Sequence, residues 1–339
     1  MVARPSSWWL ALAVAGALLL VACGHGSVAV PGAWVGGDVQ ASAKAVRGGC
    51  VLASGAPCGT EGPTIGGCPV FPADNPWNVD VSSYPVHPSS AAYLARIAQV
   101  GGSFMHPDFG SNPSYGIPYV VVPANQPAVP ITYTAYGSQS DPGPFPIPLN
   151  APVEGGSDRH VLAVQQGSCQ LYELFAASRS GSGWAAASGA RFDLRSNALR
   201  PAGWTSADAA GLPILPGLVR YDEVAAGHIN HALRVTFAQT QQGYISPARH
   251  QASSSTDPAL PPMGLRLRLR AGYDISGSTG ASRVVLEALR RYGMLVADNG
   301  SNWFISGATD PRWNDDDLDQ LKRVPASAFE VVSTGPIQH

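Results

Sequence analysis

The chain has 339 residues, of which 38 are glycine and 30 are proline, whereas only 13% are charged and the net charge is −2. No basic excess is available to neutralise phosphates, so the composition argues against nucleic-acid binding. A hydrophobic share of 45% is enough to build a core, which excludes disorder along the whole chain. Few charges and many turn-forming residues are typical of a secreted protein with short strands and long loops.

Residues 1–22 predict a signal peptide. Arg4 supplies a short positive region, and residues 8–22 form an apolar run that is too short for a comfortable membrane span. Cys23 follows the run directly, so residues 20–23 (Leu-Val-Ala-Cys) resemble a bacterial lipobox whose cysteine is lipidated; the alternative is an ordinary secretory signal with an incidental cysteine. The lipobox predicts an extracytoplasmic protein that a lipid on Cys23 anchors to a membrane without spanning it.

The four remaining cysteines predict disulfide bonds. In an oxidising compartment Cys50, Cys58, Cys68 and Cys169 would form two bridges, and three pairings are possible. We favour a local Cys50–Cys58 bridge and a Cys68–Cys169 bridge that joins the start of the folded region to a strand. No C-x-x-C pair is present, so the spacing does not indicate a zinc site.

Residues 23–66 are rich in glycine, alanine, serine and valine and predict a flexible tether, which leaves residues 67–339 as one β-rich globular domain. Apolar periodicity and end signals predict helices at 89–100, 281–292 and 314–321. Strand patterns are more numerous, at 117–122, 129–136, 160–165, 170–176, 229–237, 265–271, 294–298, 302–305 and 329–332. Short strands between Gly, Pro and Asn loops favour a β-sandwich or jelly roll with a few peripheral helices.

The first candidate catalytic segment is a polar loop, residues 154–160, followed by two strands. It carries Asp158, Arg159 and His160. In the second strand Glu173 shares a face with apolar neighbours, and desolvation there would raise its pKa as a general acid requires. The alternative is a structural Glu173 that is paired with Arg159 or another arginine.

The second candidate segment is the long polar loop 192–213. Trp204 could stack against a sugar ring, or it could simply anchor the loop in the core. Thr205 or Ser206 would cap a short helix, and Asp208 could then complement the N-terminus of that helix. Asp208 and Arg195, together with Arg159, are the polar candidates for substrate binding.

The third candidate segment spans residues 220–234. Asp222 and its neighbour Glu223 would face opposite ways on a strand, so they cannot be a catalytic pair with each other, and Asp222 stays a candidate partner for Glu173. His231 shares a face with the apolar residues that follow it. It could orient a carboxylate, act as a base or bind a metal, or it could be a hydrogen-bonded core histidine.

Two further patterns indicate ligands more weakly. Residues 265–270 alternate Leu and Arg, which predicts an outward arginine row that is either the solvated face of a sheet or a site for an anionic polysaccharide. The acidic residues of 310–319 could hold a structural Ca²⁺, although their spacing does not match an EF-hand. No other cofactor is indicated, because no G-x-S-x-G, H-E-x-x-H or P-loop motif is present.

Four phrases of the sequence carry a resemblance. Residues 71–78 (FPADNPWN), 158–162 (DRHVL), 171–174 (LYEL) and 203–224, which include GWTSADAAGLPILPGLVRYDEV, resemble a group of secreted bacterial proteins with no assigned reaction. The resemblance implies one folded unit from about Cys68 onward and transfers no catalytic residue.

These patterns predict a lipid-anchored extracytoplasmic protein that acts on a polysaccharide or cell-envelope glycan. As a glycoside hydrolase it would use Glu173 as acid, with Asp158 or Asp222 as the second carboxylate and with His160 and His231 orienting them. One alternative is a non-catalytic glycan-binding or structural lipoprotein. Another is a metal-dependent hydrolase, in which at least three of His106, Asp108, His160 and His231 converge.

Overall fold

The computed structural model describes residues 62–339. The predicted signal peptide, Cys23, almost all of the predicted tether and the proposed Cys50–Cys58 bridge therefore lie outside the described residues. Within them, strand is more frequent than helix, at 25% against 17%, which confirms a mainly β protein. No helix among residues 62–339 is long and apolar enough to cross a membrane.

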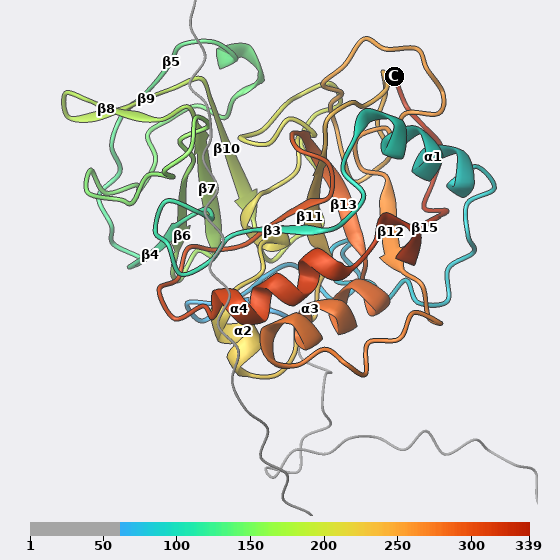
Figure 1. The fold of residues 1–339 in the computed structure, drawn as a ribbon. Helices are drawn as coiled ribbons and strands as arrows, with labels where there is room; N and C mark the ends of the chain where they lie inside the picture. Colours follow the sequence, from blue (N-terminus) through green and yellow to red (C-terminus); the bar gives the residue numbers. More distant parts are fainter. Residues whose placement is uncertain (1–61) are drawn as a thin grey trace, which may run out of the picture. The chain divides into compact units, whose positions relative to one another are not determined.

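The larger sheet has six strands in the order β15-β12-β13-β11-β14-β3 (Figure 1). Its strands are β3 (His106–Asp108), β11 (Leu233–Phe237), β12 (Arg266–Leu269), β13 (Met294–Asn299), β14 (Phe304–Ser306) and β15 (Phe329–Val332). The β11–β13 and β14–β3 pairs are parallel, and the other three pairs are antiparallel. Most residues of the three central strands, β12, β13 and β11, are buried, as expected of strands covered on both faces, although several of them are charged.

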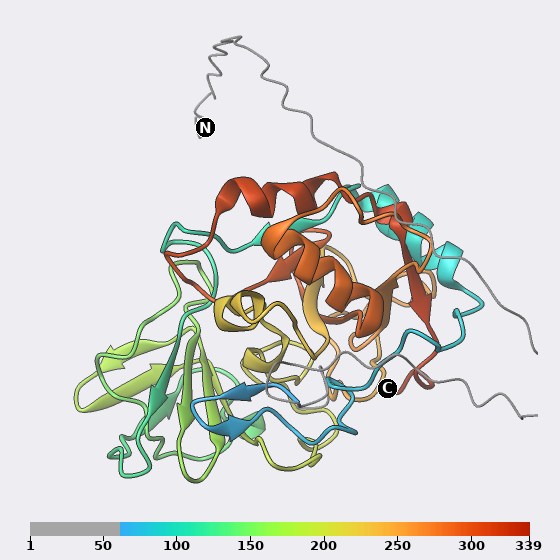
Figure 2. The same ribbon diagram turned by 90° about the horizontal axis from the view of Figure 1, so that it is seen from below.

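A second sheet has four strands in the order β10-β7-β6-β4 and lies beside the larger sheet in Figures 1 and 2. Its strands are β4 (Tyr119–Val122), β6 (Val161–Gln165), β7 (Gln170–Phe175) and β10 (Ser188–Asp193). The β6–β7 hairpin places Glu173 opposite Leu162, in the middle of this sheet. Its position is what buries the Glu173 carboxyl group.

Two small sheets complete the β structure. One pairs β1 (Thr64–Ile65) with β2 (Cys68–Pro69), and the other has the order β5-β9-β8. The strands of the latter are β5 (Ile131–Tyr133), β8 (Ser178–Ser180) and β9 (Gly183–Ala186). Because several strand pairs are parallel, the sheets are mixed; the sandwich or jelly-roll arrangement stays a prediction.

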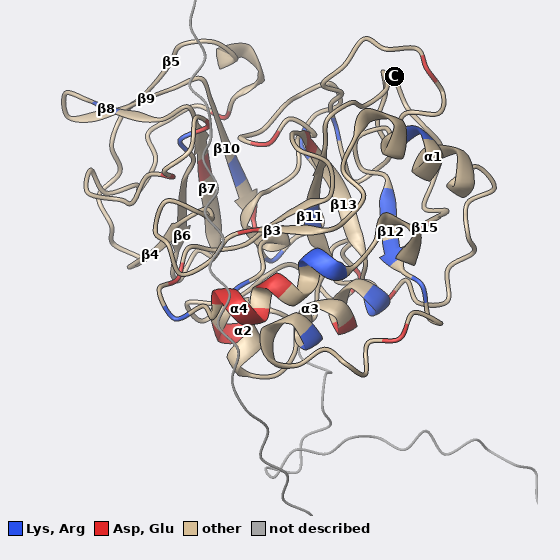
Figure 3. Ribbon diagram, viewed as in Figure 1, with Lys and Arg blue, Asp and Glu red and all other residues tan. Residues whose placement is uncertain are grey.

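The helices are few and short. They are α1 (Ser90–Val100), α2 (Tyr221–Ala225), α3 (Gly280–Arg291) and α4 (Asp315–Leu318), with 3₁₀ turns η1 (Gly137–Gln139), η2 (Leu215–Gly217), η3 (Asp319–Arg323) and η4 (Ala326–Ala328). The amphipathic α3 packs against β12, with Val285, Leu286 and Leu289 buried. Figure 3 shows acidic residues on α2 and α4 and basic residues on α3 and β12.

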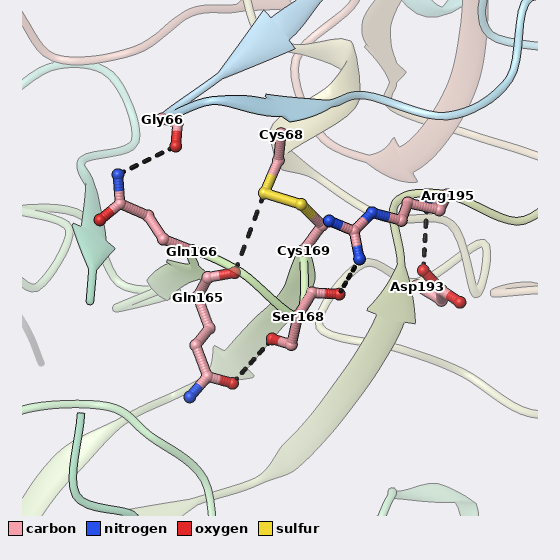
Figure 4. The surroundings of a disulfide bond; sticks show 8 residues. All are labelled: Gly66, Cys68, Gln165, Gln166, Ser168, Cys169, Asp193 and Arg195. Atoms are coloured by element: carbon pink, nitrogen blue, oxygen red, sulfur yellow. Dashed lines mark hydrogen bonds between the residues drawn. A yellow bond between two sulfur atoms is a disulfide. The ribbon is translucent and has the colours of Figure 1, made fainter. Parts of the chain in front are cut away.

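A disulfide between Cys68 and Cys169 confirms the predicted long-range bridge (Figure 4). It ties β2 to the β6–β7 turn across 101 positions of sequence. Both cysteines belong to the main hydrophobic core, and a smaller core around Phe145 and Trp184 lies under the three-stranded sheet. The bridge is compatible with an oxidising, extracytoplasmic compartment.

Three local expectations from the sequence are wrong. Arg266 and Arg268 are buried rather than solvated, because residues 76–81 and Tyr292 cover that face of β12 and accept hydrogen bonds from both guanidinium groups. Residues 221–225 form α2, so Asp222 and Glu223 do not lie on a strand. No helix forms at 205–211; the Ser206 hydroxyl instead accepts from the Asp208 N–H in a tight turn.

Candidate functional site

A cavity of about 180 Å³ collects the charged residues of several elements and is called the central cavity below. Asp108 comes from β3, Arg234 from β11 and Asp298 from β13, while Glu154, Asp158 and His160 come from the loop before β6. Its walls hold four carboxylates, one histidine and one arginine. The full lining is Asp108, Ile117, Glu154, Asp158, His160, Arg234, Thr236, Asp298, Asn299, Gly300, Ser301, Phe304 and Ser306.

Arg234 is a fixed positive charge at the base of the cavity. Its Nε and Nη2 donate to the two carboxylate oxygens of Asp208, each at 2.8 Å, and its Nη1 donates to the Ser306 hydroxyl at 2.7 Å. The Nη2 atom also lies 3.3 Å from Asp298 Oδ2. Burial would lower the pKa of Arg234, but the adjacent Asp208 carboxylate raises it above its usual value.

Asp298 differs from Asp208 because it still reaches solvent. Its side chain is 22% exposed, whereas that of Asp208 is 0% exposed. Burial, followed by the nearby negative charge of Asp208, raises the pKa of Asp298 to about 7, despite the opposing charge of Arg234. Burial likewise raises the pKa of Asp108. Asp298 can therefore carry a proton at neutral pH and donate it to a molecule in the cavity.

In contrast to Asp298, Glu154 has a lowered pKa, because it is paired with His160. His160 is 2% exposed; its Nδ1 lies 2.7 Å from Glu154 Oε2, and its Nε2 lies 3.1 Å from the Ala207 carbonyl oxygen. Both ring nitrogens face acceptors, so both carry a proton. Burial would lower the pKa of His160, but the Glu154 carboxylate raises it; burial would raise the pKa of Glu154, but hydrogen bonds and charge from His160 lower it.

The cavity thus holds one carboxylate whose pKa is lowered, Glu154, and one carboxyl group whose pKa lies near neutrality, Asp298. Groups whose surroundings push their pKa values apart are the usual basis for acid and base roles in one site. His160 keeps Glu154 ionised and in place; the sequence instead predicted that His160 orients Glu173, Asp158 or Asp222. With both nitrogens donating, His160 has no lone pair free for a metal ion.

Glu173 lies elsewhere. It is 0% exposed, and its carboxylate oxygens accept from the backbone N–H groups of Ile214 and Leu215 at 2.9–3.0 Å. Burial raises the pKa of Glu173 to about 7, as its strand pattern predicts. It lines none of the cavities described here, and its contacts hold the turn that begins η2. The ion pair with Arg159, which was the alternative for Glu173, does not form, since Arg159 Nε donates to the Ala177 carbonyl.

The third candidate segment forms a separate cluster. The His231 Nε2 lies 3.1 Å from Glu223 Oε2, and Glu223 also pairs with the buried Arg220 at 2.5 Å. His231 thus contacts a carboxylate, as predicted, but that carboxylate is Glu223. The exposed Asp222 carboxylate lies 3.9 Å from Arg220 Nε and outside the central cavity.

The substrate-binding candidates are dispersed. The Asp208 carboxylate is paired with Arg234 and is not free to bind a substrate. Trp204 is half-buried, and the Arg200 guanidinium lies over its ring at 5.7 Å from the centroid. Arg195 is exposed beside Ser168, near the disulfide (Figure 4). Of the candidates named from the sequence, Asp108, Asp158 and His160 line the central cavity, and Asp208 supports it through Arg234.

No group of three or more His, Cys, Asp or Glu side chains in residues 62–339 is arranged to hold a metal ion. His106 and Asp108 lie on β3, His160 is doubly hydrogen-bonded, and His231 belongs to the Glu223 cluster. Most of the residues considered for Ca²⁺ have partners within the chain. These are Asp310 with Arg312, Asn314 with the Asp317 N–H, Asp315 with Ser111, Asp317 with the N-terminus of α3, and Asp319 with Lys322.

Sequence reasoning missed Arg234 and Asp298 as members of this site. A usable signal was present, since each is a charged residue in or at the end of an otherwise apolar strand. Their meeting point depends on the parallel pairing of β11 with β13, in which Thr236 lies opposite Asp298. The chain matches no protein-family model, no curated protein and no solved structure.

Proposed function

We propose that the protein hydrolyses glycosidic bonds in a polysaccharide or cell-envelope glycan at the central cavity. The observation that supports this is the gathering of Asp298, Asp158 and Glu154 around one small polar cavity. Glycoside hydrolysis needs one carboxyl group that donates a proton and a second that stays ionised. The proposal retains the substrate class and the Asp158 candidate expected from the sequence, and it replaces Glu173 by Asp298 as the acid.

In this scheme Asp298 donates its proton to the oxygen of the leaving sugar while the bond from that oxygen to the anomeric carbon breaks. Asp158 is the second carboxylate: it is exposed and lines the cavity, and its Oδ1 accepts a hydrogen bond from the Ser157 hydroxyl at 3.2 Å. It assists the attack of water or forms the glycosyl intermediate that water then cleaves. Water's hydroxyl ends on the anomeric carbon. Its remaining proton returns to Asp298 when a glycosyl intermediate is cleaved; when Asp158 activates the water, that proton goes to Asp158 and then to solvent, and Asp298 regains a proton from solvent.

Arg234 has a supporting role. Its charge stabilises the buried Asp208 and holds Asp298 Oδ2 at 3.3 Å, which fixes the direction of the acid. We also propose that the enzyme works outside the cytoplasm on a lipid anchor at Cys23, with its sheets packed in a sandwich-like domain. The disulfide within residues 62–339 supports the extracytoplasmic part of this proposal.

The test is a screen of the purified full chain against soluble neutral, acidic and amino-sugar polysaccharides, scored by the reducing ends released. Asp298→Asn should lower kcat by about 10²–10⁴-fold, the usual contribution of a general acid. Asp158→Asn should also abolish turnover. Asp222→Asn is the matched control, because it removes an exposed carboxylate outside the cavity and should leave the rate unchanged.

The pH dependence gives a second readout. Because the acid must be protonated, kcat/KM of the wild type should fall as the pH rises above about 7, the pKa of Asp298. Full activity of Asp298→Asn on any cleaved substrate would exclude Asp298 as the acid. Retention of a polysaccharide without release of reducing ends would exclude hydrolysis and would favour the non-catalytic glycan-binding alternative.

A further inference from the structure

Two larger cavities adjoin the central one. The first flanking cavity has about 430 Å³ and lies between β3 and the α4–η3 segment, with Tyr115, His106 and Asp108 in its walls. The second flanking cavity has about 370 Å³ and is lined by Tyr136, Phe175 and the loops around residues 205–209 and 250–252. The central cavity, at about 180 Å³, is smaller than the ~300 Å³ at which ligand sites usually begin.

The three cavities share walls. Asp108 lines both the central and the first flanking cavity, and Asp298 lines both the central and the second. Phe304 of the central cavity stacks on His106 of the first, with ring centroids 4.2 Å apart and planes inclined by 19°. Asp108 therefore lies where the central cavity borders the first flanking cavity, and Asp298 lies where it borders the second.

His160 links the central cavity to the second flanking cavity in a similar way. Its ring centroid lies 5.8 Å from that of Phe175, and its Nε2 is bonded to the carbonyl of Ala207. Both Phe175 and Ala207 line the second flanking cavity. The residue that fixes Glu154 in the central cavity thus also packs against the wall of its neighbour.

Each flanking cavity carries one exposed tyrosine. Tyr115 is 55% exposed in the first and Tyr136 is 47% exposed in the second, although large hydrophobic side chains are rarely exposed in residues 62–339. A tyrosine ring offers an apolar face for the C–H face of a sugar and a hydroxyl for its polar groups. Each of the two cavities that adjoin the charged groups therefore offers one aromatic platform.

We propose that the three cavities are consecutive subsites of one groove, which binds several successive sugar residues of a polymer and places an internal bond at the central cavity. The protein would then be endo-acting, since substrate is held on both sides of the bond that breaks. This inference rests on the proposed glycoside hydrolysis for the position of cleavage. The binding of a polymer along the groove does not depend on it.

The test compares Tyr115→Ala and Tyr136→Ala with Phe104→Ala in the full chain. Phe104 is 52% exposed and lines none of the three cavities, so it is a matched aromatic control. Each tyrosine variant should lower kcat/KM on a cleaved polymer by about three- to tenfold, the usual effect of one lost aromatic stacking contact. The same variants should leave the rate on an aryl glycoside of the same sugar unchanged, because that substrate fills only the central cavity.

Two further measurements complete the test. Chromatography of early wild-type products should show oligomers of intermediate length rather than single sugars. Tyr115→Phe and Tyr136→Phe keep the rings and should restore most of the activity on the polymer. The groove proposal would be contradicted, even if hydrolysis is established, by release of terminal single sugars only. Equal losses of kcat/KM on the polymer and on the aryl glycoside in the tyrosine variants would also contradict it.

Affinity electrophoresis in gels that contain each polysaccharide separates this inference from the proposed reaction. Retardation of the wild type that is lost in both tyrosine variants but kept in Phe104→Ala would support the groove even if no polymer is cleaved. Cleavage that is unaffected by substitution of either tyrosine would be consistent with the proposed hydrolase activity and would contradict the proposed groove. A chain that neither cleaves nor binds any polymer of the panel would contradict both.

Discussion

Asp298 and Glu173 are both carboxyl groups whose pKa is raised to about 7 by burial, and yet they face different surroundings. Asp298 keeps 22% of its side chain exposed in the central cavity, whereas Glu173 is closed off and bonded to two backbone N–H groups. An elevated pKa identifies a desolvated acid, but access to a ligand decides whether that acid can transfer a proton.

Glu173→Gln tests the structural role of Glu173. The pKa of Glu173 in the folded state, about 7, exceeds its unfolded value of about 4.5. Between these pH values the folded protein binds a proton that the unfolded chain does not. The wild type therefore loses stability as the pH rises through this range. The stability of the glutamine variant minus that of the wild type should therefore grow with pH there, by about 3 kcal/mol in total. Urea unfolding of both proteins from pH 4.5 to 8 measures this difference, and a pH-independent difference would contradict the assignment.

Asp208→Ala tests the ion pair beneath the cavity. The substitution leaves the guanidinium of Arg234, which is 6% exposed, without its bidentate partner. We expect a loss of about 3–5 kcal/mol in unfolding free energy, because a buried charge is left uncompensated. Asp80→Ala is the control: it breaks an exposed pair with Arg291 and should cost less than about 1 kcal/mol. Similar losses in the two variants would show that Asp208 is not a structural anchor.

At the scale of elements, Asp317 joins α4 to the N-terminus of α3. Its carboxylate accepts from the Ala281 N–H at 2.6 Å and from the Gln320 side chain at 2.7 Å. Gly280 has φ +52°, and a Cβ there would overlap this same carboxylate. Asp317 therefore supplies the N-terminal cap that α3 lacks within its own sequence.

Asp317→Ala should accordingly cost about 0.5–2 kcal/mol in unfolding free energy, the usual value of a lost helix cap. Asp316→Ala removes the neighbouring carboxylate, which lies on the same short α4 without contacting α3 in this way, and should cost only a few tenths of a kcal/mol. Urea denaturation at neutral pH compares the two variants. An Asp317 variant as stable as the Asp316 variant would contradict this capping role.

At the scale of the whole molecule, the Cys68–Cys169 bridge closes the longest covalent loop in the described chain. Cys68→Ala combined with Cys169→Ala should cost about 2–5 kcal/mol, because a separation of 101 residues restricts the unfolded chain strongly. The melting temperature should fall in the double variant, and a thiol reductant should lower that of the wild type in the same direction. An unchanged melting temperature in the variant would show that the bridge adds nothing to the stability of the fold.

The β-rich character, the β6–β7 hairpin, helices α1 and α3 and the long disulfide were all predictable from the sequence. The helices, strands and hairpin follow from hydrophobic periodicity and turn residues within one short segment, and the disulfide follows from the number and spacing of the cysteines. Asp158 and His160 were predictable for a similar reason, since charges are scarce in this chain and cluster in that loop. The β3 and β8 strands were missed because they are short and polar, and β9 and β10 were missed because Gly, Ala and Ser, which have low strand propensity, make up much of their sequence.

Only the tertiary structure decided which charged side chains are buried and which of them meet in one cavity. The Leu–Arg alternation of β12 predicts one solvent-exposed face. Residues 76–81 cover that face, so Arg266 and Arg268 are buried. Arg234 and Asp298 are brought together by the parallel β11–β13 pair, and Asp108 reaches the same cavity through β3. The sequence determined which residue types and local elements exist; long-range strand pairing determined which charges share a cavity, because side chains far apart in sequence carry no local signal of that contact.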